Sequence, residues 1–351
     1  MSALKLVSTR SLSREEWLQW RHKGIGSSDA AAAIGKSPYT SPLALWLEKT
    51  GKKPPEDLSQ KDAVRWGTLL EPLIAQAYAE QTGKKVRRVN AILQHPEHPY
   101  LLANLDRIIE GGGILEIKTA GLRSQGFWEE GVPEHYRIQV LHQLLVTGKS
   151  WAEVAVLIGG QEFRTYRIEP EGGELSELLH AEQVFWEHVT SDTPPDTDGT
   201  ESSGKALQWL YPRSTATLVD YTDHGAMNQL FRELIQARAK SKASDVHEAI
   251  LEQRMKESLG DAEGALFLQG KVLWKSSKDS RALDVQRLIQ EHPDWVAPYW
   301  ITKPGSRRFT VQSEYKEHSH DQRTRHHPAC VGADCHRQGR REKRQASPGK
   351  G

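Results

Sequence analysis

Two carboxylates and an ammonium group lie close together in the stretch from Leu105 to Lys118. Residues two apart in a β-strand point to the same side, so Glu116 and Lys118 share a face if this stretch is extended. If the intervening hairpin is centred on Gly111, Asp106 lies directly opposite Glu116 on that face. A different centre would place the two carboxylates on opposite faces. The hypothesis is therefore that Asp106, Glu116 and Lys118 converge.

Two converging carboxylates repel each other unless a cation joins them. Hard oxygen ligands favour Mg²⁺ or Mn²⁺, and a cation bound there lowers the pKa of its water and stabilises charge on a phosphoryl oxygen. The lysine would orient the attacking water and oppose the developing negative charge. By itself a Glu-x-Lys pattern usually marks only the solvated face of a strand, and Glu314-Tyr315-Lys316 matches it too.

Two further residues belong to the candidate site. Glu71 lies on the apolar stripe of a helix predicted over 62–81, where a metal or its waters would compensate a buried carboxylate. The alternative for Glu71 is a salt bridge to Arg65 or a position at the rim. Gln139 lies on a helix predicted over 133–147, and its alternative is an ordinary surface amide.

Arg21 and Ser28 form a second candidate group near the N-terminus. A capping box at Ser13–Glu16 predicts the start of the helix that carries Arg21, and a glycine-containing turn then leads to Ser28. A guanidinium group beside a hydroxyl near a helix N-terminus would bind a phosphate well. The alternative is a surface charge at Arg21 and a serine that caps the short Ala-rich helix that follows.

The surrounding elements predict a mixed α/β fold. Period-two patterns predict strands, and helical spacing with caps predicts the helices between them. The expected architecture is a restriction-endonuclease-like core in which helices flank a mixed central sheet. The predicted strands are 85–93, 100–109, 114–119, 151–158 and 162–168, and the later helices are 133–147 and 174–191.

Composition divides the chain into four parts. Residues 1–192 form the expected core, and 193–204 form a linker rich in Pro, Gly, Ser and Asp. Residues 205–312 form a mainly helical, coiled-coil-like appendage. Its central element is a long helix or a helical hairpin over 224–259, and short strands are expected near 265–274 and 308–312. The remainder, 313–351, is expected to be a disordered basic tail.

Charge and cysteine content restrict the classes of function. The 47 Lys and Arg residues nearly balance the 46 Asp and Glu residues, but the tail is basic and the rest slightly acidic. Near-neutrality therefore does not exclude a nucleic-acid enzyme. Both cysteines lie in the tail, which excludes disulfides and thiol nucleophiles from the rest. The tail also contains a candidate zinc-ligand set: His326, His327, Cys330, Cys335 and His336. The alternative is that a frame error in the sequence produced the composition of the tail.

No apolar run reaches the roughly 18 residues of a membrane helix, and the N-terminus lacks a signal-peptide core. These features predict a soluble, cytoplasmic protein that does not bind membranes.

The candidate residues, taken in order, resemble a known family. The series Glu71, Asp106, Glu116-x-Lys118 and Gln139 is similar to the PD-(D/E)xK nuclease core. More specifically it resembles the lambda-exonuclease-like branch, the YqaJ-type viral recombinases. Arg21 with Ser28, and Trp66-Gly67 preceding Glu71, match motifs of that branch. The resemblance covers about residues 12–190.

The resemblance implies a two-metal exonuclease, with Mg²⁺ or Mn²⁺, that degrades linear duplex DNA from 5′ to 3′ for phage-type recombination. Asp106 and Glu116 would bind metal with help from Glu71, Lys118 would position the water and Gln139 would support it. Arg21 and Ser28 would hold the 5′-phosphate. The family also implies a ring-shaped homo-oligomer, a single-strand annealing protein as partner, and a phage or prophage origin in a bacterial host.

One departure and two alternatives remain. The family often has Ser/Pro-Asp-Gly where this chain has Leu105-Asp106-Arg107, so Arg107 must reach the DNA if it is to replace the missing serine contact. The same site would also serve an endonuclease, for restriction or for structured DNA. A non-catalytic DNA-binding scaffold is the third interpretation, although the complete Asp, Glu, Lys and Gln set counts against it.

Overall fold

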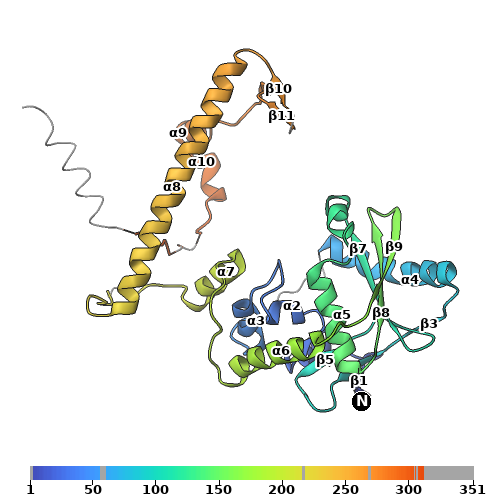
Figure 1. Cartoon of the computed structure of the whole chain (residues 1–351). Coiled ribbons are helices and arrows are strands. Elements are labelled where there is room, and N and C mark those ends of the chain that lie inside the picture. The colour runs from blue at the N-terminus through green and yellow to red at the C-terminus, as the bar shows by residue number, and fades with distance from the viewer. Residues whose placement is uncertain are drawn as a thin grey trace, which may run out of the picture. The chain divides into compact units, whose positions relative to one another are not determined.

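The computed structural model describes residues 3–55, 61–215, 218–267, 270–303, 305 and 307–311. The chain divides into two compact units, Met1–Pro212 and Arg213–Gly351 (Figure 1). The candidate residues all lie in the first unit. The predicted Cys/His group of the tail lies outside the described residues.

A five-stranded sheet forms the centre of the first unit. Its strand order is β3-β6-β7-β8-β9, and β7 and β8 are parallel whereas the other neighbours are antiparallel. The 3₁₀ helix η1 and helix α5 connect the two parallel strands. The bounds are β3 (Val86–Arg88), β6 (Arg107–Ile109), β7 (Ile114–Ala120), η1 (Leu122–Trp128), α5 (Glu134–Thr147), β8 (Ala152–Ile158) and β9 (Glu162–Ile168).

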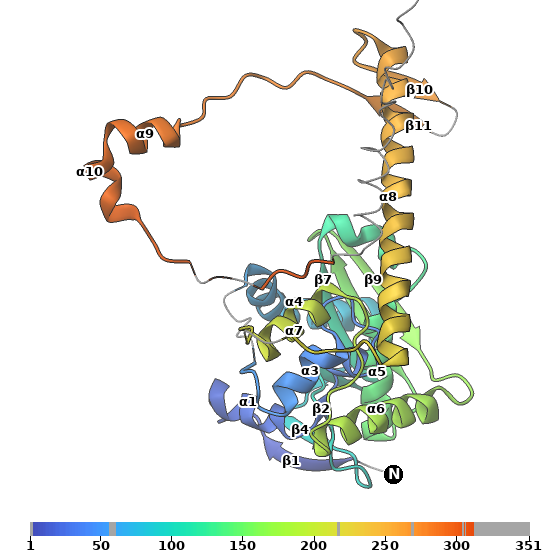
Figure 2. The same cartoon turned by 90° about the vertical axis from the view of Figure 1, so that its left-hand side faces the viewer.

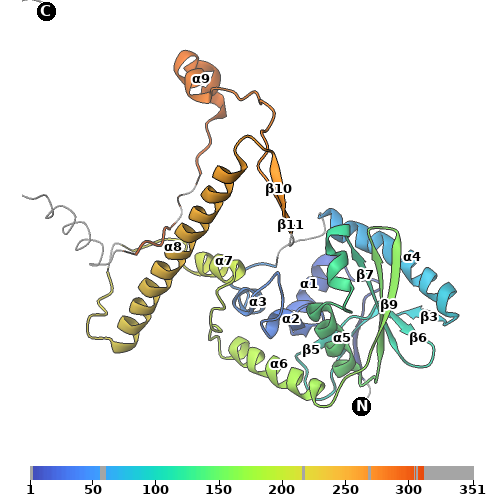
Figure 3. The same cartoon turned by 45° about the horizontal axis from the view of Figure 1, so that its top comes forward.

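Alternation along β7 and β8 divides the core between the two faces of this sheet. Ile114 and Val154 pack in one core cluster with Leu144 of α5, whereas Ile117 and Ala155 pack in the other with residues of α4 (Asp62–Thr82). Figures 1 and 3 show α4 and α5 on opposite faces. The prediction of a mixed sheet flanked by helices is confirmed.

A second, four-stranded sheet and several helices complete the unit. The strand order is β1-β4-β5-β2, with β2 parallel to β5 and the other pairs antiparallel. The strands are β1 (Leu4–Ser8), β2 (Ile25–Gly26), β4 (Ala91–Gln94) and β5 (Leu101–Ala103). The helices are α1 (Arg14–His22), α2 (Ala30–Ala33), α3 (Pro42–Lys49), α6 (Glu174–Thr190) and α7 (Glu201–Leu210).

Two strands expected to be continuous are each divided between the sheets. The predicted strand 85–93 forms β3 and β4, and the predicted strand 100–109 forms β5 and β6. In both cases one half pairs within the five-stranded sheet and the other within the four-stranded sheet. Period-two alternation continues across such a crossing, so the sequence pattern did not reveal it. Asp106 lies at one of these crossings, between β5 and β6.

The boundary between the units differs from the expected linker. Helix α7 begins within 193–204, with Thr200 as its N-cap, and packs on α3. The backbone N–H of Ser41, the N-cap of α3, donates to Ser202 Oγ at 2.9 Å. This packing explains why residues up to Pro212 belong to the first unit despite their linker-like composition.

The second unit is built around one long helix. Residues expected to form a long helix or a hairpin form the single helix α8 (Gly225–Leu259), as Figure 2 shows. The other elements are the antiparallel pair β10 (Gly264–Phe267) and β11 (Gly270–Leu273), then α9 (Val285–Glu291), α10 (Pro293–Val296) and the 3₁₀ helix η2 (Ala297–Tyr299). The strand expected at 308–312 is not formed over 308–311, its described part. Over the described ranges, no helix is both long and apolar enough to span a membrane.

Candidate active site

Glu116 is the most enclosed of the predicted site residues. It lies in β7, only 3% exposed, and points to the face of the sheet that α5 covers. Its Oε1 accepts hydrogen bonds from Lys118 Nζ at 2.7 Å and from Gln139 Nε2 at 2.6 Å. Its Oε2 accepts one from Gln143 Nε2 at 2.7 Å. Three donors therefore hold this carboxylate in one orientation.

Lys118 and Gln139 also contact each other. Lys118 Nζ donates to Gln139 Oε1 at 3.0 Å and lies 4.7 Å from the centre of the Tyr136 ring. Burial alone would lower the pKa of Lys118, but the adjacent carboxylates of Glu116 and Asp106 outweigh burial and raise it. The lysine is therefore a positioned cation and not a neutral amine.

Strand pairing confirms the predicted register of the hairpin. Arg107 pairs with Leu115 and Ile108 pairs with Ile114, which is the arrangement expected for a turn centred on Gly111. Asp106, one residue before β6, consequently reaches β7. Its Oδ2 accepts a hydrogen bond from the backbone N–H of Ile117 at 2.8 Å.

Asp106 is destabilised as a carboxylate. Burial, followed by the nearby charge of Glu116, raises the pKa of Asp106 to about 8 in spite of the Lys118 ammonium. Ionisation of Asp106 is therefore costly even with the Lys118 ammonium nearby. The oxygen-rich donor set and this repulsion fit a hard divalent metal ion.

Glu71 lies at the same cavity but points to different partners. Arg107 Nη1 donates to Glu71 Oε1 at 2.5 Å, and Arg88 Nη2 lies 3.3 Å from the same oxygen. Glu71 therefore forms salt bridges, as the alternative interpretation held, but its partners are Arg107 and Arg88 in place of the predicted Arg65. Arg107 does not meet the condition set for replacing the missing serine contact, because its side chain is only 8% exposed and is held against Glu71.

The structure brings four predicted residues to the wall of one open cavity of about 420 Å³: Glu71, Asp106, Glu116 and Lys118. Gln139 contacts two of them from α5. Within the described part of the chain, no three His, Cys, Asp or Glu residues are already grouped as a metal site. Glu71 extends from α4 toward Arg107, whereas Glu116 accepts its hydrogen bonds from Lys118 and from residues of α5.

Gln143 is a member of this site that the sequence interpretation missed. It is completely buried, and its Nε2 donates to Glu116 Oε2 at 2.7 Å and to Asn104 O at 3.1 Å. The sequence signal that could have identified Gln143 is its spacing from Gln139. Residues four apart on a helix are neighbours, and Gln139 lies one turn earlier. Tyr136, a further turn back along the helix from Gln139, was likewise missed and lies beneath Lys118.

Arg21 and Ser28 contact each other but do not line this cavity in the described structure. Arg21 Nη2 donates to Ser28 Oγ at 2.8 Å and also pairs with Asp29. Asp29, not a serine, is the N-cap residue of α2, and its side chain makes no capping bond. The expectation of a serine cap was wrong because the hydroxyl of Ser28 accepts from Arg21 instead.

Asp29 holds this second group together. Its Oδ2 accepts from Lys49 Nζ at 2.7 Å and from the backbone N–H of Gly26 at 3.1 Å. Burial would raise the pKa of Asp29, but the charges of Arg21 and Lys49 and these hydrogen bonds hold it well below its ordinary value. Arg21 is therefore pre-positioned beside Ser28 by a buried, ionised carboxylate.

Comparison with known proteins identifies the family. Residues 16–150 match the model of the YqaJ-like viral recombinase domain. The chain is 36% identical over 295 residues to the uncharacterized protein YqaJ of Bacillus subtilis (strain 168), covering 82% of this chain and 91% of that one. The chain belongs to the YqaJ-like viral recombinase family. The family resemblance inferred from the five motifs is confirmed.

Solved structures similar to this family member include two exonucleases. The alkaline exonuclease LHK-Exo from Laribacter hongkongensis is 21% identical, with a TM-score of 0.43, over 51% of this chain and 94% of that one. A phage-related exonuclease from Haemophilus somnus 129PT is 12% identical, with a TM-score of 0.36, over 50% and 99% of the respective chains.

Proposed function

We propose that this protein is a metal-dependent exonuclease that degrades linear double-stranded DNA from 5′ to 3′ and leaves 3′ single strands for phage-type recombination. The observation that carries the proposal is Glu116, buried beside Asp106 and held by Lys118, Gln139 and Gln143 at the wall of an open cavity. Membership of a viral recombinase family supports DNA as the substrate.

Each side chain then has a role in phosphodiester hydrolysis. Asp106 and Glu116 would hold Mg²⁺ or Mn²⁺, two per active site, with Glu71 as the third acidic group. When bound, such ions lower the pKa of a coordinated water and stabilise charge on a phosphoryl oxygen. Lys118 orients the attacking water and opposes negative charge as it develops. Gln139 fixes Lys118 relative to Glu116, since its amide bonds to both.

The second group supplies recognition of the DNA end. Arg21 and Ser28 would bind the 5′-phosphate, because a guanidinium and a hydroxyl 2.8 Å apart present adjacent donors to one anion. Asp29 keeps Arg21 in place without filling all of its donors. A ring-shaped homo-oligomer and a single-strand annealing partner belong to the same proposal.

The test uses end-labelled duplexes with Mg²⁺, beside covalently closed circular DNA. The expected result is immediate loss of a 5′ label as mononucleotide, whereas a 3′-labelled strand shortens progressively and releases its label only at the end. Cleavage of the closed circle would instead establish an endonuclease. Glu116→Gln is the catalytic control: if it degrades DNA as fast as the unmodified protein, this cavity is not the active site.

A further inference from the structure

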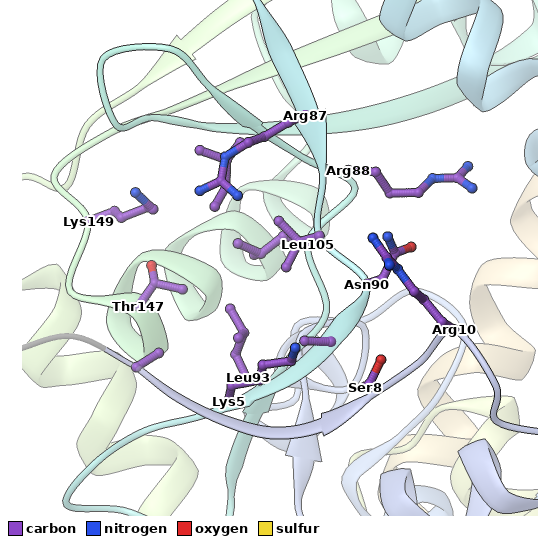
Figure 4. A pocket seen from close by; sticks show the side chains of 14 residues that line it. Lys5, Ser8, Arg10, Arg87, Arg88, Asn90, Leu93, Leu105, Thr147 and Lys149 are labelled. Atoms are coloured by element: carbon purple, nitrogen blue, oxygen red, sulfur yellow. The ribbon is translucent and has the colours of Figure 1, made fainter.

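A second cavity, of about 560 Å³, lies in the first unit outside the site described above. Its walls come from β1, the β3–β4 segment and the C-terminal end of α5 with the loop that follows (Figure 4). Five of its lining residues are cations: Lys5, Arg10, Arg87, Arg88 and Lys149. None of the described residues that line it is acidic. We call it the basic cavity.

The cations of the basic cavity are poorly compensated. Arg88 reaches Glu71 at 3.3 Å, and Lys149 Nζ donates to the carbonyl of Gly112 at 2.5 Å. Over the ranges that the structure covers, Lys5, Arg10 and Arg87 make no ion pair. Surface lysines and arginines elsewhere in this unit commonly pair with a neighbouring carboxylate, as Lys84 does with Glu153. The basic cavity therefore carries an excess of positive charge that its own walls do not neutralise.

Two of these cations repel each other directly. Burial, and then the charge of Arg87, lower the pKa of Lys149. Figure 4 shows the side chains of Arg87 and Lys149 on the same side of the cavity and that of Arg10 on the other, beside Asn90. A bound anion would relieve the repulsion between Arg87 and Lys149.

The floor of the basic cavity is apolar and adjoins the active site. Leu93, Leu105 and Ile108 line it. Leu105 immediately precedes Asp106, so neighbouring residues of one segment face the two cavities. Arg88 lines the basic cavity and also contacts Glu71 at the other one.

We propose that the basic cavity binds the sugar-phosphate backbone of single-stranded DNA. Five cations exceed what a single phosphate group needs, and their spread over facing walls matches a chain of phosphates. A duplex is too wide to enter a concavity of this volume, whereas one strand can enter and lay its sugars or bases on the apolar floor. The lining contains no aromatic ring among the described residues, so binding rests on phosphate contacts and is insensitive to base sequence.

This binding site lies beyond the proposed hydrolysis, and its test does not require hydrolysis. The probe is a fluorescent oligothymidylate of about 12 nucleotides with a 5′-hydroxyl. Affinity is measured in a chelator over a range of salt concentrations. The chelator prevents cleavage, and the 5′-hydroxyl removes the phosphate that Arg21 and Ser28 are proposed to bind.

The variant is Arg87→Gln with Lys149→Gln. Its matched control is Lys205→Gln with Lys256→Gln, which removes two cations that each pair with a glutamate one turn earlier on a helix. We expect the cavity variant to lose at least about tenfold in affinity, and the slope of log K against log salt to fall by about 0.7 for each phosphate contact removed. The control should bind as the unmodified protein does.

Unchanged affinity in the cavity variant, or an equal loss in the control, would overturn the proposal. So would equal competition by a duplex of the same length. Thermal unfolding of both variants establishes that they are folded, and Lys149→Gln alone decides the question if the double variant is not. Retained binding of the oligothymidylate by a protein that degrades no linear duplex DNA in Mg²⁺ would count against the proposed nuclease and leave the basic cavity supported.

Discussion

The side-chain amide of Gln143 donates a hydrogen bond of 2.7 Å to Glu116 Oε2, on the side of the carboxylate away from Lys118. Groups that orient a metal-binding carboxylate in this way set both its direction and its affinity for the ion. Gln143 therefore prepares Glu116 for its proposed role without itself lining the cavity.

Gln143→Leu removes this hydrogen bond and keeps the approximate volume of the side chain. We expect the Mg²⁺ concentration for half-maximal nuclease activity to rise by about 10- to 100-fold, because Glu116 is no longer held from that side. A Mg²⁺ titration of activity measures the shift. Gln183→Leu, which alters an exposed amide on α6, is the control. An unchanged titration would assign Gln143 a purely structural role.

Lys118→Met removes the ammonium group but leaves the proposed metal-binding carboxylates. The expected result is a fall in kcat of about 10²- to 10³-fold with little change in KM, since the lost interaction acts on developing charge. Lys205→Met should leave kcat unaltered. A similar loss in both variants, or a change confined to KM, would contradict the role given to Lys118.

Asp106→Asn tests the repulsion between the paired carboxylates. In a chelator the variant should be more stable than the unmodified protein by about 0.5–2 kcal/mol, because a neutral amide replaces a buried acid beside Glu116. Mg²⁺ should raise the Tm of the unmodified protein and no longer that of the variant. Thermal unfolding with and without Mg²⁺ checks both points, and an equal Mg²⁺ response would show that Asp106 is not a ligand.

Arg21→Ala is expected to abolish discrimination between DNA ends. The unmodified protein should degrade 5′-phosphorylated duplexes faster than 5′-hydroxyl duplexes, and the variant should degrade both at the slower rate. Competition between the two substrates in one reaction measures the ratio directly. Ser28→Ala should reduce the ratio by less, because a neutral hydroxyl contributes less than a guanidinium. A ratio that Arg21→Ala leaves intact would locate end recognition elsewhere.

His142 and Glu182 form a buried pair that should make stability depend on pH. His142 Nδ1 lies 2.7 Å from Glu182 Oε1 and Nε2 lies 2.9 Å from Leu102 O. Both partners are acceptors, so the ring donates to both only as the imidazolium. Burial opposes that charge, but Glu182 and the Leu102 carbonyl outweigh it and raise the pKa of His142.

Because the folded pKa of His142 exceeds the unfolded value of about 6.5, its stabilisation is complete below that pH and is lost as pH rises through the folded value. We expect the free energy of unfolding to fall over that range in the unmodified protein and to fall less in His142→Gln. Glu182→Leu should cost about 3–5 kcal/mol, because it leaves a buried charge without its partner. Denaturant unfolding at several pH values measures all three.

Local pattern was sufficient for most of the elements that carry the site, although it did not reveal that 100–109 divides into β5 and β6. The capping box at Ser13 and Glu16 forms as expected. Helices α5 and α6 begin and end within one residue of the predicted ranges 133–147 and 174–191. For the hairpin, the glycines at 111–113 predicted where the turn forms but left more than one centre open, and the strand pairing shows the centre that places Asp106 opposite Glu116. Helix caps and turn positions depend on residues that are adjacent in the chain, and the sequence alone determines which residues are adjacent.

Tertiary packing determined which residues from distant parts of the chain meet at the site. The sequence predicted Glu71, Asp106, Glu116, Lys118 and Gln139 as site residues, and their order indicated the family. Only the folded chain showed that Glu71 pairs with Arg107, that Gln143 holds Glu116 and that cations from three separate segments line one basic cavity. These relationships join residues up to 144 positions apart, from Lys5 to Lys149, so no local periodicity encodes them. They follow from the division of two chain segments between the two sheets and from the face of the central sheet that each helix covers.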